Sequence, residues 1–229
     1  MRLRETAIHW LDGTPAHDRA RFRHLTNLVA SCFDACLEPV QTDFVVKVNT
    51  VLRSTPTWPD LTVIPVRNDK EDTVVGVERA IDPAEVLSGT DDEVLAAVLR
   101  IHVESLVHLA SARGWDPQPF VRAGDCVLAS GYEIRASLPD KVNRFQRDIV
   151  ARAWGVIDRE SGRITLAVYD STGRELKRTE TSFPPSWDLL KNGLHKIAWT
   201  DRRSAELQPR QRGGIDVGPR LTVETPAES

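Results

Sequence analysis

The sequence has little cysteine: Cys32, Cys36 and Cys126 are the only three in 229 residues. An odd count excludes the fully paired disulfide framework of small secreted domains. Cys32 and Cys36 lie four positions apart in a predicted helix, so they share a face. We interpret them as two small apolar residues on the buried face. The alternative, half of a metal site, has no Cys/His pair of matching short spacing elsewhere in the chain.

Long apolar runs and an excess of positive charge are also missing. No stretch approaches the roughly 18 apolar residues of a bilayer-spanning helix. The first six residues include the charged Arg2, Arg4 and Glu5, and no apolar signal-peptide core follows them. The formal net charge is -3, so no global field attracts nucleic acid. The sequence therefore predicts a cytoplasmic protein without a membrane partner.

The motifs of cofactor and metal chemistry are absent as well. The glycines are too dispersed for a phosphate-binding loop, and there is no G-x-S-x-G nucleophile turn. His102 and His108 are six positions apart, about 240° around a helix, so they do not share a metal. His102 lies within an apolar stripe, where we expect a neutral, hydrogen-bonded histidine. The alternatives are a pH-sensitive core or a groove contact. We predict no cofactor, no metal and no catalytic array.

The first half of the chain predicts two helices around a group of strands. Apolar residues recur every three or four positions from about residue 16 to 37. Strands are expected near 44–52, 61–66 and 73–81, and the simplest topology for them is an antiparallel meander. A long helix over residues 91–113 is capped by Thr90 and stopped at Gly114.

The second half predicts strands followed by one helix. Strands are expected at 126–137, 150–158, 163–170 and 175–181, with hairpin turns at 158–162 and 170–173. Ser186 is expected to cap a closing helix that carries Trp187, Leu190, Leu194 and Ile197. The fold class is α+β, with two antiparallel-sheet units, each packed with amphipathic helices. These are residues 1–120 and 121–203, followed by a disordered tail at 204–229.

Basic residues alternate with aromatic ones over a short window of the second half. Arg144, Arg147, Arg152 and Trp154 represent this window, and basic residues among aromatics are one way to hold single-stranded RNA. Acidic residues are interspersed, so a solvated mixed-charge surface is the alternative. Lys177 and Arg178 follow nearby.

The C-terminal strands and the turn after them are similar to a known toxin family. Residues 163–168, 173–177 and the Thr-Ser-Phe-Pro-Pro-Ser-Trp segment at 181–187 resemble the tail of bacterial EndoU-type toxin nucleases. The resemblance implies an RNA-cleaving domain, with Lys177, Thr181 and Tyr132 at site positions. That family uses histidines in a Gly-Gly-His-like loop, and residues 128–134 here hold none. The resemblance therefore implies either an RNA-cleaving domain of the barnase or EndoU type or a degenerate domain that only binds RNA.

The N-terminal half is similar to another class of protein. The Trp-Pro-Asp-Leu-Thr-Val segment at 58–63, the helix at 91–113 and the Trp-Asp-Pro-Gln-Pro-Phe segment at 115–120 resemble immunity proteins of bacterial polymorphic toxin systems. Such proteins occlude a toxin surface, often with acidic side chains. The acidic candidates are Asp69, Glu71, Asp72, Asp91, Asp92 and Glu93, and Trp58 is the tryptophan most expected to be exposed. The alternative reading is a solvated turn and a helix cap.

These observations favour a non-enzymatic, immunity-like module that binds a toxin-like protein and masks its surface. An RNA-cleaving or RNA-binding toxin-type domain is the second hypothesis, and a structural interaction module is the third. The sequence leaves the oligomeric state and the identity of the partner open.

Overall fold

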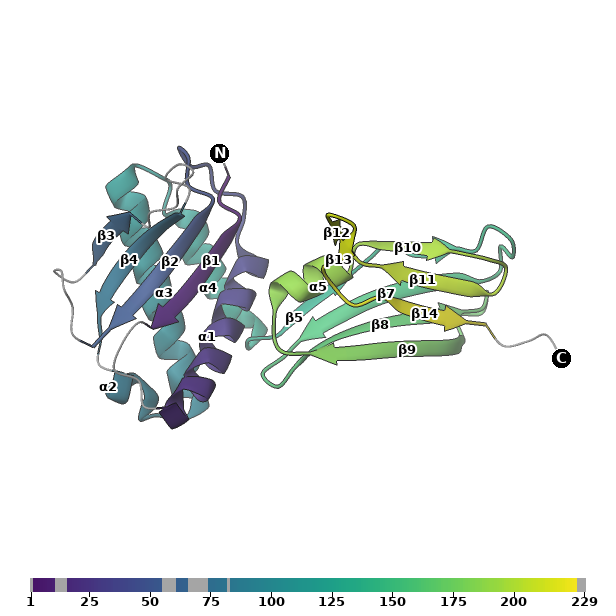
Figure 1. Cartoon of the computed structure of the whole chain (residues 1–229), viewed down its shortest axis with the longest axis horizontal. Helices are drawn as coiled ribbons and strands as arrows, with labels where there is room; N and C mark the ends of the chain where they lie inside the picture. Colours follow the sequence, from purple (N-terminus) through teal and green to yellow (C-terminus); the bar gives the residue numbers. More distant parts are fainter. Residues whose placement is uncertain (1, 11–15, 55–60, 66–73, 82, 226–229) are drawn as a thin grey trace. The chain divides into compact units, whose positions relative to one another are not determined.

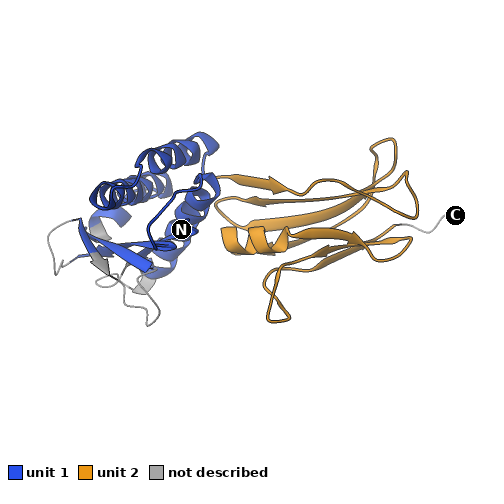
Figure 2. Cartoon of the chain, turned by 90° about the horizontal axis from the view of Figure 1, so that it is seen from above, with its two compact units in different colours: residues 1–132 blue, residues 133–229 orange. Residues whose placement is uncertain are grey.

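The protein forms two compact units, residues 1–132 and 133–229 (Figure 2). The computed structural model describes residues 2–10, 16–54, 61–65, 74–81 and 83–225. Five helices and four sheets lie within these ranges. The expected α+β class is confirmed. The boundary between the units falls after Tyr132, whereas the sequence predicts it after Phe120.

The first unit contains a mixed sheet with the strand order β1-β2-β4-β3. Strands β1 (Glu5–Trp10), β2 (Lys47–Arg53) and β4 (Val74–Ala80) are parallel, and β3 (Thr62–Pro65) is antiparallel to β4 at the edge. The predicted antiparallel meander is therefore wrong. Strand β1 is not among the strands predicted from the sequence, and helix α1 (Ala16–Cys36) connects it to β2. A strand–helix–strand crossover brings the second strand back parallel to the first.

Helices cover one face of this sheet (Figure 1). Helix α1 packs on β1, and α3 (Asp91–Arg113) packs on β2 and β4. Helix α4 (Gln118–Ser130) packs against both α1 and α3, and the short α2 (Pro83–Leu87) packs against α3. The core between them is apolar, with Leu28, Phe33, Leu95, Leu106 and Phe120 fully buried.

Helix α3 begins and ends where the sequence predicts. The Thr90 side chain accepts a hydrogen bond from the Glu93 backbone, Glu93 reciprocates, and Gly114 ends the helix in the left-handed conformation. By length and composition alone, α3 is long and apolar enough to cross a membrane. However, 56% of that stretch is buried inside the protein, as in the core helix of a packed unit.

The strand expected at 126–137 is wrong over most of its length. Residues up to Ser130 belong to α4, and only Ile134–Ser137 form a strand, β5. Helix α4 buries Phe120, Ala123 and Val127, which recur at helical spacing. Gly131 ends it with a φ of 61°, a conformation that glycine adopts without steric cost.

A disulfide joins α1 to α4 through Cys36 and Cys126. Cys32 remains a free thiol at 0% exposure, and burial raises its pKa to about 12. The interpretation as a buried apolar residue is confirmed for Cys32 and wrong for Cys36. Helical spacing shows which residues share a face, but the approach of Cys126 depends on the tertiary packing of α4.

The second unit contains antiparallel sheets only. In the five-stranded sheet, β5 and β6 (Lys141–Val142) both pair with β7 (Val150–Ile157). Strand β8 (Gly162–Tyr169) pairs with β7 on one side and with β9 (Glu175–Phe183) on the other. The second sheet has the order β10-β11-β14, and β12 pairs with β13 in a small hairpin. Both hairpin turns that the sequence predicts, at 158–162 and 170–173, connect the expected strands.

The expected closing helix is shorter than predicted. Helix α5 (Trp187–Gly193) ends at its glycine, and Ile197 and Trp199 belong to strand β10 (Lys196–Trp199), where they alternate with exposed residues. Helix α5 packs on β7 and β8. A side chain at Gly155 on β7 would collide with Leu190, so this glycine allows the close approach of the helix.

The residues expected to be a disordered tail form strands instead. These strands are β11 (Ser204–Gln208), β12 (Gln211–Arg212), β13 (Ile215–Asp216) and β14 (Leu221–Glu224). On β11 and β14, every second side chain faces the core of the second unit. The buried residues are Ala205 and Leu207 on β11, and Leu221 and Val223 on β14. Strands β11 and β14 each bury only two apolar side chains and β12 and β13 bury none, which is too few for a periodic signal in a Pro- and Arg-rich sequence.

Candidate binding surface

The acidic surface expected in the first unit is only partly within the described residues. Trp58, Asp69, Glu71 and Asp72 lie outside them. Asp91 and Asp92 are exposed in the first turn of α3.

Asp91 is engaged in a contact within the first unit. Arg21 of α1 pairs with it at 2.7 Å and also donates to the carbonyls of Leu87 and Gly89. Glu93 is occupied by the α3 cap, where hydrogen bonds from Thr90 lower its pKa. The contacts of Arg21 fix α1 against the start of α3. The contacts of Glu93 cap α3, so Arg21, Asp91 and Glu93 all have a structural role.

The residues proposed for RNA cleavage are not brought together within one unit. Tyr132 is the last residue of the first unit, 6% exposed, with a φ of 64°. Lys177 and Thr181 lie on β9 of the second unit, four residues apart along the strand. In the described part of the chain, no group of three or more His, Cys, Asp or Glu side chains is arranged to hold a metal ion.

His102 is buried and hydrogen-bonded, which confirms the sequence-based interpretation. Its Nδ1 lies 2.8 Å from the Thr50 hydroxyl, and its Nε2 lies 3.1 Å from the Thr6 hydroxyl. Thr6 donates its hydroxyl proton to Asp34 Oδ1 at 2.6 Å, so it accepts from His102 Nε2–H. Nδ1 then accepts from Thr50. Burial lowers the pKa of His102 to about 3, so the ring is neutral.

The second unit offers a different surface, the exposed face of its five-stranded sheet. A Cβ atom at Gly155 would point toward α5. Successive side chains of a strand alternate between its two sides, so Trp154 and Arg152 on β7 point away from α5. We call this side the outer face. The strand register places the following residues on it: Val142, Val150, Arg152, Trp154, Arg163, Thr165, Ala167, Tyr169, Glu175, Arg178 and Glu180.

Apolar and aromatic side chains gather at one end of the outer face, where β6, the start of β7 and the end of β8 meet. Val142 is opposite Val150, and Val150 is opposite Tyr169. Val142 is 51% exposed, and Trp154 and Tyr169 are half-buried. The Arg152 guanidinium lies 4.6 Å from the centre of the Tyr169 ring, a cation–π contact. Because aromatic and arginine side chains are enriched in protein interfaces, this arrangement is typical of a binding surface.

The arginines of the outer face named above are each paired with a carboxylate. Arg152 pairs with Asp140 at 3.0 Å, Arg163 with Asp158 at 3.0 Å, and Arg178 with Glu175 at 2.7 Å. The hydrogen bond from Arg178 holds the pKa of Glu175 below its ordinary value. Glu175 also accepts from Tyr169, and partial burial together with that bond raises the pKa of the phenol. The outer face is therefore a mixed-charge surface without a large net charge.

The loop at residues 143–149 adjoins the outer face at Val142. Asn143 is 0% exposed, its amide donates to the Arg202 carbonyl at 2.9 Å, and its oxygen accepts from the Phe145 backbone at 2.8 Å. This buried side chain holds the loop in one conformation. Phe145 is 44% exposed, and the Arg144 guanidinium lies 4.6 Å from its ring centre. The loop thus presents a preorganised aromatic–arginine pair to solvent.

The RNA-binding candidates from the sequence therefore divide between two neighbouring places. Arg152 and Trp154 lie on the outer face, and Arg144 and Arg147 belong to the loop. Val142, Val150 and Tyr169 are not among the site residues predicted from the sequence. The predicted hairpin turn at 158–162 sets the register of β7 and β8 and pairs Val150 with Tyr169.

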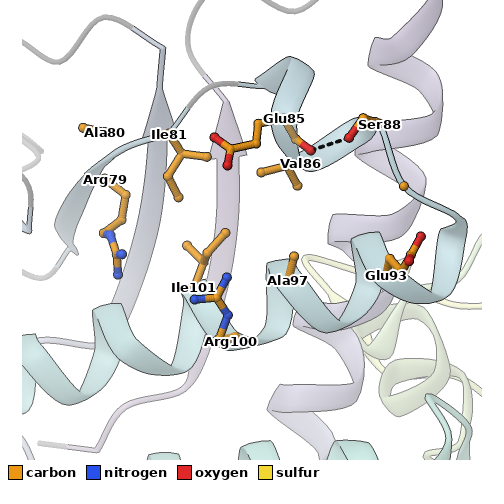
Figure 3. Close-up of a pocket in the computed structure, with 11 residues that line it drawn as sticks. Arg79, Ala80, Ile81, Glu85, Val86, Ser88, Glu93, Ala97, Arg100 and Ile101 are labelled. Atoms are coloured by element: carbon orange, nitrogen blue, oxygen red, sulfur yellow. Dashed lines mark hydrogen bonds between the residues drawn. The ribbon is translucent and has the colours of Figure 1, made fainter.

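A separate hollow of about 510 Å³ lies in the first unit (Figure 3). It is formed by the end of β4, helix α2 and helix α3. Ile81, Val86 and Ile101 supply apolar walls, and Arg79, Arg100 and Glu85 surround them. Arg79 and Arg100 both contact Glu104, at 3.1 Å and 3.6 Å. Because charges of both signs line it, the hollow favours no single class of ligand.

No family model, curated protein or solved structure matches the chain.

Proposed function

We propose that the protein is a non-enzymatic binding module that masks the surface of a protein partner with the outer face of its second unit, as immunity proteins do. The observation that supports this proposal is a group of apolar and aromatic side chains on the outer face, Val142, Val150, Trp154 and Tyr169, interspersed with carboxylate-paired arginines. Protein interfaces combine apolar and aromatic side chains with polar ones.

The charge pattern favours a protein partner over nucleic acid. Affinity for RNA or DNA derives largely from cations that neutralise phosphates and release counterions. Arg152, Arg163 and Arg178 already neutralise carboxylates of the same unit. A protein surface that carries both signs of charge can exchange ion pairs with such arginines, while its apolar residues cover Trp154 and Val142.

Site-specific photo-crosslinking tests the proposal. A photoreactive phenylalanine analogue replaces Val142 on the outer face or, as the control, Leu128 on α4, which is 57% exposed. We expect one protein adduct from the Val142 position in an RNase-treated bacterial lysate, lost when Arg152→Glu is added, and none from the Leu128 position. Equal labelling from both positions, or no protein adduct, would contradict the proposal.

The affinity of the identified partner gives the second measurement. We expect Trp154→Ala to weaken binding by at least about 30-fold, as at an interface hot spot. Val121→Ala, at an exposed position of α4, is the matched control and should leave the dissociation constant unchanged.

The 143–149 loop favours RNA binding as a second candidate function. Phe145 is an exposed aromatic ring on which a base can stack, and within the described residues Arg144 and Arg147 have no carboxylate at ion-pair distance. Under this hypothesis, single-stranded RNA binds with strong salt dependence and Phe145→Ala removes the binding. RNA cleavage that is independent of metal and lost in Lys177→Ala would instead support a nuclease.

A further inference from the structure

The second unit carries a hollow of about 490 Å³ that is distinct from the outer face. Residues at the start of β10 and at the end of β11 line it. The β12–β13 hairpin lies beside these strand ends (Figure 1). The size of the hollow is within the range of small-molecule sites. None of the residues that line the hollow belongs to β6, β7, β8 or β9, so the hollow and the outer face are formed by different strands.

The residues that line this hollow carry positive charge only. Lys196, Arg210 and Arg220 contribute guanidinium or ammonium groups, and His195 adds an imidazole. No aspartate or glutamate is among the lining residues. Within the part of the chain that the structure describes, Lys196 and Arg210 have no carboxylate at ion-pair distance.

Arg220 differs from Lys196 and Arg210 because it forms ion pairs with two carboxylates that are not part of the lining. Its guanidinium donates to Glu206 at 2.6 Å and to Asp216 at 2.9 Å. Gln208 donates to Glu206, and Gln211 donates to Asp216. This network links β11, β12 and β13 and fixes three lining side chains. The uncompensated charge of the hollow therefore comes from Lys196 and Arg210.

The backbone around Arg210 is also fixed. Its N–H donates to the carbonyl of Asn192 at 2.8 Å, and its carbonyl accepts from Val217 at 2.9 Å. Asn192 and the neighbouring Pro209 are buried. Arg210 thus extends from an ordered segment, and Lys196 lies opposite Gln208 in the β10–β11 pair. Two cations on fixed backbone segments can bind one multiply charged anion with little loss of conformational freedom.

We propose that this hollow binds a small phosphate-bearing molecule through Lys196 and Arg210, with Gln208 and Gln211 as polar side chains of the wall. Guanidinium and ammonium groups are the side chains that recognise phosphate oxygens. The hollow is larger than a single phosphate, so an organic phosphate fits it better than the inorganic ion. This inference does not depend on the partner of the outer face.

Calorimetric titration of the full chain with inorganic phosphate, pyrophosphate and ADP at low ionic strength tests the proposal. We expect saturable binding of pyrophosphate or ADP that is weakened at least about tenfold by Lys196→Gln together with Arg210→Gln. The charge-matched control, Lys141→Gln with Arg202→Gln, removes two exposed cations outside the lining and should leave the affinity unchanged.

Amide NMR spectra of the same variants report whether the second unit stays folded and where the ligand binds. Shifts concentrated in residues 195–196 and 208–211 would support the proposal. Absence of saturable binding would overturn it, as would equal weakening in both double variants, which indicates diffuse attraction. Binding restricted to RNA oligomers would also overturn it, because the hollow would then not select small phosphates.

Discussion

His102 is a histidine whose charge state depends on folding. It is fully buried between Thr50 and Thr6, and its ring contacts Phe33 edge-on with centroids 4.9 Å apart. A neutral ring satisfies both threonine hydroxyls, whereas a protonated ring would place an uncompensated charge in the core. Folding therefore lowers the pKa from an ordinary value of 6.5 to about 3.

This shift predicts acid sensitivity of the first unit. Because the folded pKa is below the unfolded one, the unfolded chain binds the proton first as the pH falls below 6.5. We expect His102 to reduce the free energy of unfolding by about 2.5 kcal/mol between pH 7 and pH 4.5. Urea titrations at several pH values measure this loss.

Replacement of His102 isolates its contribution. His102→Gln is expected to lower stability at pH 7 by about 1–3 kcal/mol, because the threonine hydroxyls lose a well-placed partner. It should also remove the about 2.5 kcal/mol acid dependence that we assign to this ring. His108→Gln, on the same helix but half-buried, serves as the control. An unchanged acid dependence in His102→Gln would contradict the assignment.

At the scale of elements, the ends of α3 are determined by local chemistry. Thr90 and Glu93 form a reciprocal capping box, and three acidic residues occupy the first turn, where the helix dipole favours negative charge. We expect Thr90→Ala to lower the free energy of unfolding by about 1 kcal/mol in urea titrations. Ser111→Ala, at an exposed position of the same helix, should change it by less than about 0.5 kcal/mol.

The disulfide between α1 and α4 connects two elements whose cysteines are 90 residues apart in the sequence. We expect Cys36→Ser with Cys126→Ser to lower the stability of the first unit by about 2–4 kcal/mol, because the unfolded chain gains freedom. Dithiothreitol should destabilise the wild type by the same amount and leave the double variant unchanged. Equal stability of oxidised and reduced protein would contradict this role.

Disulfides persist mainly in oxidising environments, whereas the cytoplasm keeps thiols reduced. The bridge therefore indicates an oxidising compartment, and the sequence-based expectation is the cytoplasm. Thiol labelling of freshly lysed cells distinguishes them. The bonded state leaves Cys32 as the single thiol, and its raised pKa and burial make it unreactive until the first unit unfolds. Three labelled cysteines under denaturing conditions would show a reduced protein, and one would show the bridge.

At the scale of the whole molecule, the chain consists of two units whose strand pairings are internal. All strand pairs of the described residues join partners within residues 1–132 or within 133–229. We expect a fragment of residues 133–229 to fold alone and to show dispersed amide NMR signals. A fragment ending at residue 203, the expected end of this unit, should not fold, because it lacks β11 and β14. Folding of the shorter fragment would contradict the role assigned to these strands.

The sequence alone was sufficient for features that depend on neighbouring residues. The limits of α3, the two hairpin turns of the second unit and the buried, neutral His102 follow from capping residues, turn residues and apolar periodicity, because these act over a few positions. The α+β class follows for the same reason. Asp91 and Asp92 were correctly placed at the start of a helix, although Asp91 is engaged by Arg21.

Only the tertiary structure decided the features that join distant segments. Parallel pairing of β1 with β2 depends on the crossover through α1. Strands β11 and β14 are stabilised by a core to which each contributes only two buried apolar side chains. The outer face exists because strand register places Val142, Val150 and Tyr169 in one row. The phosphate-binding hollow likewise depends on β10, β11 and β12 meeting. Such contacts involve residues far apart in the chain, and their energy depends on packing, which no local pattern records.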